Sequence, residues 1–157
     1  MASIAETLRG SEVAVIVFGP RPPYTDIFCA EATQRIVSEA VREGLERLIC
    51  QTGAMVGEYR ANRSLLFELL ARLYRRRQPK PAADRTLQEA AVRASDLRWT
   101  MVKPPRLTEG GRSRNVRVGP DVRVGLLSSV SRLDLAQFIL DEIAASRFVE
   151  KVVFVSG

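Results

Sequence analysis

A chain of 157 residues is long enough for one domain with a hydrophobic core and too short for two. Its composition, 46% hydrophobic and 27% charged, is ordinary for a globular protein, and its formal net charge of +6 favours anionic partners. The sequence contains no histidine, which excludes Ser-His and Cys-His nucleophile systems and every histidine metal site.

The sequence shows no targeting or membrane signal. The amino terminus lacks a basic segment followed by an apolar one, and no apolar run approaches the ~20 residues of a membrane span. We therefore expect a cytoplasmic protein with no membrane partner. The two cysteines, Cys29 and Cys50, match no metal-binding spacing, so we interpret both as buried thiols and expect no bound metal.

Six consecutive apolar residues, Val13 to Phe18, predict a strand that is buried on both faces at the centre of a parallel sheet. A short helix over 3–8 precedes this strand, and the loop Gly19-Pro20-Arg21-Pro22-Pro23 ends it. Apolar residues recur at the helical period from Cys29 to Val41, and Leu45 to Thr52 forms a second strand. Strand, helix and strand in this order make a βαβ unit with a right-handed crossover.

The alternation of helices and strands continues in the second half of the chain. A helix is expected over 62–77, with leucines at positions 65, 66, 69, 70 and 73. The segment Gln78-Pro79-Lys80-Pro81 breaks it, and a second helix follows over 82–95. A third strand is expected over 97–103, where Pro104 and Pro105 end it.

The last third of the sequence completes the fold. Residues 116–118 and 122–127 resemble a short hairpin around Gly119-Pro120-Asp121. A helix begins at Ser131 by capping-box spacing, and a final strand covers 151–156. The predicted fold class is therefore α/β, with a mostly parallel sheet and a small hairpin near 116–127.

Basic side chains are concentrated at the end of the helix over 62–77: Arg72, Arg75, Arg76, Arg77 and Lys80. Cations at the carboxyl end of a helix interact favourably with its dipole, so we interpret this cluster as a solvated helix terminus. Contact with an anionic substrate or with nucleic acid stays open as an alternative. Because Tyr74 is the only aromatic residue among these cations, we expect no specific nucleic-acid partner.

Three of the predicted strands end in unusual loops: 19–23, 52–54 and 104–106. Loops that follow neighbouring parallel strands meet at the carboxyl edge of the sheet, so these loops predict one rigid, proline-rich crevice. Arg21, Lys103 and Arg106 would give the crevice positive charge, unless Lys103 points into a helix interface instead.

Five segments now resemble the atypical short-chain dehydrogenase/reductases: FGPRPP at 18–23, QTGA at 51–54, WTMVKPPRLT at 99–108, SRLDLA at 131–136 and VVFVS at 152–156. The nearest branch is the NAD(P)H-binding group of biliverdin-IXβ (flavin) reductases and NmrA-like proteins. The resemblance runs in order over essentially the whole chain. It implies the C-terminal part of a Rossmann-type doubly wound sheet, as a single, incomplete NAD(P)-binding domain over 1–157.

The resemblance also shows what this sequence lacks. Family members begin with a glycine-rich loop and a helix that hold the cofactor's pyrophosphate, and this sequence contains no G-x-G-x-x-G. NAD or NADP is therefore expected to bind this chain only weakly. The strand over 13–18 would also lack a neighbour, which favours a homodimer or a companion chain at the exposed sheet edge.

The resemblance assigns roles to residues in the three loops. Thr52 matches the hydroxyl near the nicotinamide and is the candidate catalytic residue, although a local backbone bond would also explain it. Arg21 and Arg106 match positions near the nicotinamide, with exposed loop arginines as the alternative. The implied cofactor-binding residues are Gly19, Pro20, Arg21, Pro22, Gln51, Thr52, Gly53, Pro104, Pro105 and Arg106.

The implied activity is hydride transfer from NAD(P)H to a small conjugated acceptor such as a flavin, quinone or tetrapyrrole. No Tyr-x-x-x-Lys pair occurs in the sequence, so positioning of donor and acceptor would supply much of the rate. Without the phosphate loop the chain alone should be impaired. The alternative is a non-catalytic, NmrA-like regulatory remnant or a half-domain that depends on a partner.

Overall fold

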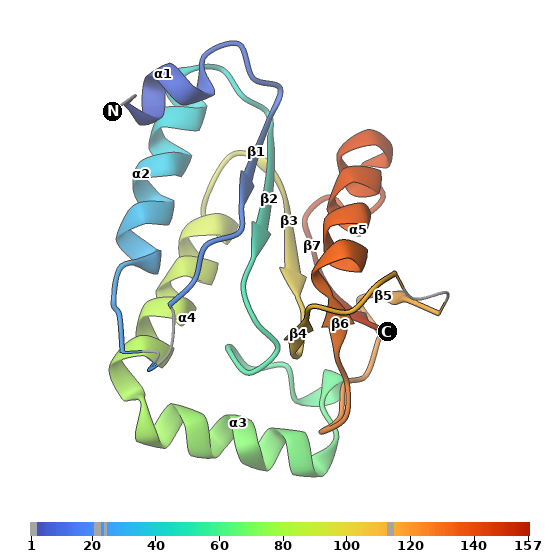
Figure 1. The fold of residues 1–157 in the computed structure, drawn as a ribbon. Helices are drawn as coiled ribbons and strands as arrows, with labels where there is room; N and C mark the ends of the chain where they lie inside the picture. Colours follow the sequence, from blue (N-terminus) through green and yellow to red (C-terminus); the bar gives the residue numbers. More distant parts are fainter. Residues whose placement is uncertain (1–2, 21–22, 24, 113–114) are drawn as a thin grey trace.

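Five strands form the main sheet (Figure 1): β1 Val13–Ile16, β2 Arg47–Gln51, β3 Arg98–Lys103, β5 Arg117–Gly119 and β7 Lys151–Ser156. The structure, a computed structural model, describes residues 3–20, 23, 25–112 and 115–157. The strand order is β1-β2-β3-β7-β5, and all neighbours are parallel except β5 and β7. The predicted α/β class and the parallel pairing of the first three strands are confirmed.

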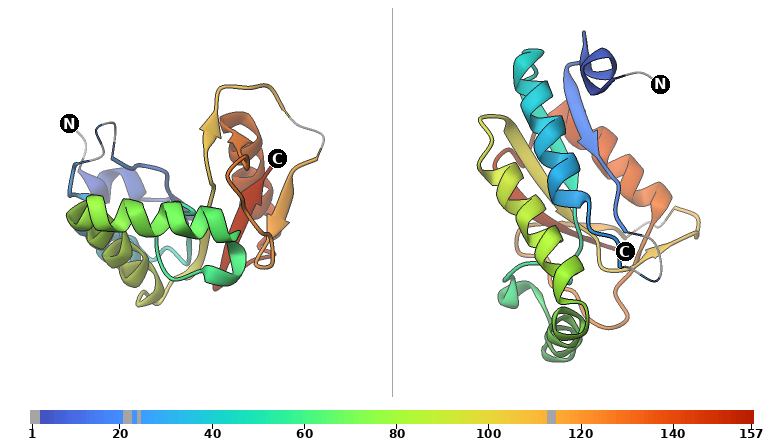
Figure 2. Two further views of the ribbon diagram at one scale, coloured as in Figure 1. Left: turned by 90° about the horizontal axis from the view of Figure 1, so that it is seen from below. Right: turned by 90° about the vertical axis from the view of Figure 1, so that its left-hand side faces the viewer.

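Helices cover both faces of this sheet (Figure 2). Helices α2 Cys29–Arg42 and α4 Pro79–Arg93 pack against each other on one face, and α1 Ile4–Leu8 contacts α2. Helix α5 Arg132–Ala145 covers the opposite face. This arrangement is the doubly wound architecture that the sequence predicts.

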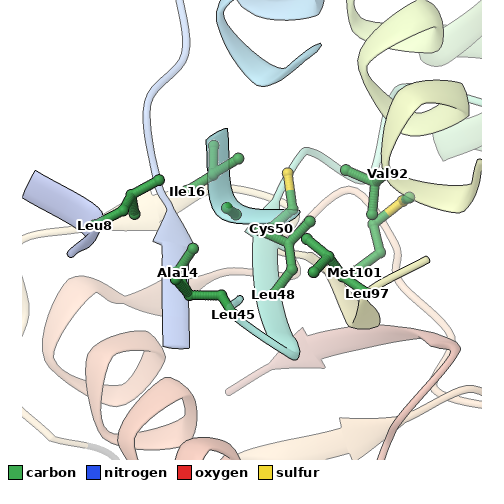
Figure 3. Close-up of a cluster of buried hydrophobic side chains, with 10 residues drawn as sticks. Leu8, Ala14, Ile16, Leu45, Leu48, Cys50, Val92, Leu97 and Met101 are labelled. Atoms are coloured by element: carbon green, nitrogen blue, oxygen red, sulfur yellow. The ribbon is translucent and has the colours of Figure 1, made fainter. Parts of the chain in front are cut away.

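Successive residues of the central strands serve two separate cores because strand side chains point to alternate faces. One core joins the sheet to α2 and α4, and Figure 3 shows Leu48, Cys50 and Met101 within it. The other joins Ile49, Val102 and Val153 to α5, in a cluster that also contains Leu135 and Phe138. Both cysteines are buried free thiols, as predicted.

The remaining elements lie around the carboxyl edge of the sheet. The 3-10 helix η1 Arg60–Asn62 precedes α3 Leu65–Arg77, which lies across this end of the molecule in Figure 1. Strands β4 Leu107–Thr108 and β6 Val130–Ser131 form a separate two-stranded parallel sheet. Within the described residues, no helix is long and apolar enough to cross a membrane.

The expectation of a central, doubly buried first strand is wrong. In the sheet of described residues β1 pairs only with β2, so it forms an edge. Ala14 and Ile16 are buried, whereas Val15 and Val17 are 40% and 56% exposed. An unbroken apolar run shows that both faces can be buried, but it does not show whether elements are present to cover them.

The predicted hairpin over 116–127 is also wrong. Strand β5 pairs with β7, and the chain beyond its turn pairs with a different segment. The Val124 N–H donates to the Asn62 carbonyl and the Ser64 N–H donates to the Val124 carbonyl, each at 2.9 Å. The turn at Gly119-Pro120-Asp121 was recognisable from the sequence, but the partners of its two arms were not.

The helix boundaries correct two further expectations. Helix α3 begins after Ser64, whose hydroxyl accepts the Phe67 N–H at 3.2 Å, rather than at Asn62. Helix α4 begins at Pro79 instead of following the proline-rich segment. Proline is well tolerated in the first turn of a helix because the N–H groups there have no intrahelical acceptor.

A buried ion pair connects the sheet to α5. Arg47 Nη2 lies 2.8 Å from Glu142 Oε1, and the two side chains are 5% and 0% exposed. The same carboxylate accepts the backbone N–H groups of Phe148 at 2.9 Å and Arg147 at 3.2 Å. The sequence analysis did not identify this pair.

Candidate functional site

The loops after β2 and β3 are bonded to each other at the carboxyl edge of the sheet. The Thr52 N–H donates to the Val102 carbonyl at 2.9 Å, and the Ala54 N–H donates to the Pro104 carbonyl at 3.0 Å. The parallel register carries both loops to the same edge because Cys50 and Met101 are direct partners. The predicted proximity of loops 52–54 and 104–106 is therefore confirmed.

The loop after β1 begins at the same edge but is held by α4. Arg85 Nη1 donates to the Phe18 carbonyl at 3.2 Å, and a Cβ atom on Gly19 would lie 3.4 Å from that nitrogen. Gly19 and Pro20 are half-buried. Arg21 and Pro22, which the sequence also assigns to the cofactor, lie outside the described residues.

The Thr52 side chain belongs to a buried polar network. Its hydroxyl donates to Glu89 Oε1 at 3.0 Å and accepts from Lys103 Nζ at 3.1 Å. Lys103 also donates to Glu89 and is fully buried, so it takes the second of its two expected roles, in a helix interface. The alternative for Thr52 was a hydrogen bond from its hydroxyl to a local backbone group. In the structure this hydroxyl instead bonds two side chains.

Tyr59 completes this network from the loop before α3. Its hydroxyl donates to Glu89 Oε2 at 2.9 Å and accepts from the Arg93 guanidinium. Lys103 Nζ lies 4.4 Å from the centre of the Tyr59 ring. A Cβ atom on Gly57, whose φ is +72°, would lie 2.9 Å from Glu89 Oε2 and 2.5 Å from the ring, so only glycine fits there.

Burial governs the protonation of this network. It lowers the pKa of Lys103 from its ordinary 10.5 to about 8, and the nearby Glu89 carboxylate offsets only part of this effect. Burial and the Glu89 charge raise the pKa of Tyr59, so its hydroxyl keeps its proton. Lys103 is therefore a protonated donor at neutral pH that loses its proton more readily than an exposed lysine does.

The loop between Thr52 and Tyr59 is held in place by Arg63. Its guanidinium donates to the carbonyl groups of Ala54 at 2.7 Å, Val56 at 2.7 Å and Gly57 at 3.0 Å. Arg63 Nη1 also lies 2.8 Å from Glu68 Oε2, so α3 supplies the countercharge. One buried arginine thus shapes the loop that carries the candidate catalytic residue.

Acid should weaken this anchor. Burial opposes the charge on Glu68, but hydrogen bonds from Arg63, Arg75 and Arg72 outweigh it and lower the pKa of Glu68 from 4.5 to about 2. Between pH 4.5 and about 2, Glu68 is protonated in the unfolded chain but still ionised in the folded protein. The stabilisation that its ion pairs provide is therefore fully present above pH 4.5 and is lost as the pH falls toward 2. We expect Glu68→Gln to cost about 1.5–3 kcal/mol of unfolding free energy at neutral pH.

In urea titrations, the difference in unfolding free energy between Glu68→Gln and the parent chain should disappear as the pH approaches 2. Glu31→Gln is the matched control, because Glu31 forms an exposed ion pair with Arg35 and should differ little from the parent at any pH. A constant difference for Glu68→Gln across this pH range would show that its charge has no role in holding the loop.

The other predicted cofactor residues lie along the two bonded loops. Gln51 and Gly53 are half-buried, Pro104 is buried and Pro105 is half-buried. Arg106 is exposed, and its carbonyl accepts the Val130 N–H at 2.9 Å. Their roles at the cofactor stay predictions, since the structure establishes only their positions.

The sequence analysis missed Glu89, Arg93, Tyr59, Arg63 and Arg85. A signal for the first was present, because Glu89 falls on the same helical stripe as Arg85 and Val92 in the helix before β3. Charged residues in the stripe that faces a core indicate a buried pair. No comparable pattern marks Tyr59 and Arg63, which stand in irregular segments.

The described residues leave open space beside the loop after β2. A Cβ atom on Gly53 would meet nothing within 4 Å, so this loop presents its backbone to open space at the carboxyl edge. At the amino end of α2, the backbone N–H groups that could hold the pyrophosphate already have an acceptor. There the Asp84 carboxylate accepts the N–H groups of Phe28 at 3.2 Å, Cys29 at 2.9 Å and Ala30 at 3.0 Å.

Comparison with known proteins identifies a matching family. The sequence pattern of a family described as NAD(P)H-binding matches residues 1–146. No curated protein sequence matches the chain.

Solved structures share the fold at low sequence identity. One match is a protein from Bacillus halodurans that is assigned as an NAD-dependent epimerase/dehydratase. It superposes with a TM-score of 0.77 at 16% sequence identity, and the match covers 100% of this chain and 71% of that one. The match to the anaerobillin reductase ChuY from Escherichia coli O157:H7 has a TM-score of 0.77 at 17% sequence identity. It covers 97% of this chain and 68% of that one. The match to a wide-type short-chain dehydrogenase/reductase from Veillonella parvula, in complex with NADP, has a TM-score of 0.72 at 16% sequence identity. It covers 98% of this chain and 66% of that one.

Proposed function

The chain belongs to the NAD(P)H-binding family, and from this membership we propose that these 157 residues supply the nicotinamide side of an NAD(P)H-dependent reductase. The atypical short-chain dehydrogenase/reductase type, identified from the sequence, is the type to which its structural neighbours also correspond. The observation that carries the proposal is the pair of bonded loops at the carboxyl edge, with Thr52 fixed between Lys103 and Glu89.

When bound, NAD(P)H supplies a hydride, and an acceptor that gains a hydride also needs a proton. We assign proton delivery to the Thr52 hydroxyl, which would exchange its bond to Glu89 for one to the acceptor. Lys103 Nζ, 3.1 Å from the same oxygen, would replace the proton, and its lowered pKa suits this transfer. A flat conjugated acceptor, such as a flavin, quinone or tetrapyrrole, fits an edge stiffened by Pro104 and Pro105.

The test is NADPH oxidation by the 157-residue chain with riboflavin 5′-phosphate, a soluble quinone or biliverdin as the acceptor. We expect a slow rate that stays proportional to the NADPH concentration and falls about 100-fold or more in Thr52→Val. Thr86→Val is the matched control, because the exposed Thr86 donates its hydroxyl proton to the Ala82 carbonyl of its own helix. An unchanged rate in Thr52→Val would remove this residue from the chemistry.

A second candidate function is non-catalytic binding. It is favoured by the burial of Thr52, whose hydroxyl already has both a donor and an acceptor inside the protein. In that case Thr52→Val would lower the stability of the loop, and no acceptor would be reduced by the parent chain.

The exposed sheet edge carries a proposal about partners. Strand β1 has unpaired backbone groups along one side in the sheet of described residues, and Val15 and Val17 are exposed beside it. We propose that a second copy or a companion chain pairs with this edge, since an open apolar strand favours strand addition. A companion chain could also bring the phosphate-binding segment that this sequence lacks.

A further inference from the structure

Helix α3 turns a row of leucines toward solvent. Together with two leucines in the loop before β6, they are 42–94% exposed and form what we call the leucine surface: Leu65, Leu66, Leu69, Leu70, Leu73, Leu126 and Leu127. Figure 1 and the left view of Figure 2 show α3 along the end of the molecule, with no other element in front of it. A group of exposed apolar side chains of this kind indicates an interaction site.

The outward orientation of these leucines follows from the side on which the helix is anchored. Phe67 and Ala71 are buried beneath the helix, next to the Arg63–Glu68 pair. Residues spaced by four, such as Leu65 and Leu69, then lie above one another on the opposite side. The apolar face of α3 is therefore available without any rearrangement of the core.

The loop before β6 extends this face at the amino end of the helix. The Ser64 N–H bonds the Val124 carbonyl at 2.9 Å, and a Cβ atom on Gly125 would lie 3.6 Å from the Ser64 hydroxyl. Leu126 and Leu127 follow directly in the sequence. The leucine surface thus combines two segments that are about 60 residues apart in the sequence.

Arginines flank the leucine surface at both ends. Arg60 and Arg123 line a cleft of about 560 Å³ at its amino end, beside Leu65. Arg76 and Arg77 are exposed at its carboxyl end. The single acidic residue of α3, Glu68, lies on the buried side and is neutralised by three arginines, so the helix presents no negative charge outward.

We propose that the leucine surface binds the surface of a lipid bilayer that contains anionic headgroups. Leucines inserted at the headgroup boundary, with arginines beside them, are the two features that hold an amphipathic helix in the plane of such a surface. The expectation of no membrane partner rested on the lack of a spanning segment. Adsorption to one face of a bilayer requires none.

Charge and composition disfavour the other occupants. A second copy packed antiparallel on α3 would place Arg76 and Arg77 against the partner's arginine-flanked amino end, and a parallel copy would place them against themselves. Like charges at a contact are destabilising. Nucleic acid would neutralise the arginines but would leave seven leucines in water. An anionic bilayer would take the leucines into its headgroup boundary and would neutralise the arginines.

The test is flotation of the 157-residue chain with vesicles of phosphatidylcholine alone or mixed with phosphatidylglycerol. We expect binding to the mixed vesicles that weakens with salt, and little binding to the neutral ones. Leu69→Ser with Leu73→Ser should weaken binding roughly tenfold or more. Arg76→Gln with Arg77→Gln should weaken it roughly 10–30-fold. Leu69 and Leu73 are 63% and 44% exposed, and both arginines are exposed, so circular dichroism should show intact folding.

Matched controls come from other helices. Leu133→Ser with Leu140→Ser changes two leucines of α5 that are 58% and 60% exposed, and it should leave vesicle binding unchanged. Arg35→Gln with Arg42→Gln removes two exposed positive charges of α2 and should have a small effect.

Three results would overturn the proposal: equal binding to neutral and anionic vesicles, no effect of the Leu69 and Leu73 changes, or a dimer in sedimentation equilibrium that these changes dissociate without vesicle binding. The last result would assign the surface to a second copy. The assay contains no NADPH, so its outcome is independent of the proposed reductase activity.

Discussion

The 157-residue chain is expected to bind NADPH only at millimolar concentration or more weakly. The sequence contains no glycine-rich phosphate loop, and Asp84 occupies the N–H groups at the amino end of α2. Hydrogen bonds to a charged phosphate contribute roughly 1.5–3 kcal/mol each, so the loss of two or three removes about 4–6 kcal/mol. At 1.4 kcal/mol per factor of ten, this is three to four orders of magnitude in affinity.

Reduced nicotinamide mononucleotide is the informative control for this experiment. If the loops after β2 and β3 hold only the nicotinamide and its ribose, this half-cofactor should bind within about a factor of three of NADPH, a difference below 1 kcal/mol. Calorimetry should be paired with light scattering, because association through β1 would accompany weak binding. Micromolar affinity for NADPH from a monomer would show that another part of the chain holds the pyrophosphate.

Removal of the Glu142 carboxylate is expected to have the largest effect on stability. Glu142→Ala leaves the Arg47 guanidinium buried without its countercharge and removes the acceptor of the Phe148 N–H. Breaking a buried ion pair in this way costs about 3–5 kcal/mol, out of a total of about 5–15 for a domain. In urea titrations followed by circular dichroism, the variant should unfold at a much lower concentration than the parent.

Two comparisons separate this effect from the simple loss of a charge. Glu31→Ala breaks the exposed pair with Arg35 and should cost no more than about 1 kcal/mol. The double change Arg47→Met with Glu142→Leu removes both charges together, and it should recover much of the loss. If Glu142→Ala stayed within 1 kcal/mol of the parent, water would have to reach Arg47.

Local sequence pattern was sufficient for the parallel sheet and for the edge that carries the site. The apolar runs of β2 and β3 lie at the centre of the sheet, where both of their faces are covered. The same kind of run in β1 was misread, because periodicity reports which faces of a strand are apolar and not how many neighbours it has. Proline and glycine at the ends of β2 and β3 correctly indicated two loops that meet.

The network around Thr52 could not be predicted in the same way. Lys103 and Glu89 stand on a strand and a helix, and their contact depends on how α4 packs on the sheet. The orientation of α3 raises a similar difficulty. Five leucines on one side would be expected to face the core, yet Phe67 and Ala71 are buried instead. The Arg63–Glu68 pair fixes that choice, and no sequence periodicity reports it.

The position of β7 has a consequence for synthesis of the protein on the ribosome. This strand follows all the others in the sequence but lies between β3 and β5 in the sheet. The ribosome adds 31 residues between Gly119 and Lys151, which takes roughly two to six seconds at 5–20 residues per second. During that interval β3 has an open edge and β5 has no partner. The nascent chain therefore passes through a stage in which the edge of β3 is unpaired and the α5 core lacks Val153 and Val155. Chaperones that bind exposed apolar segments would act at this stage.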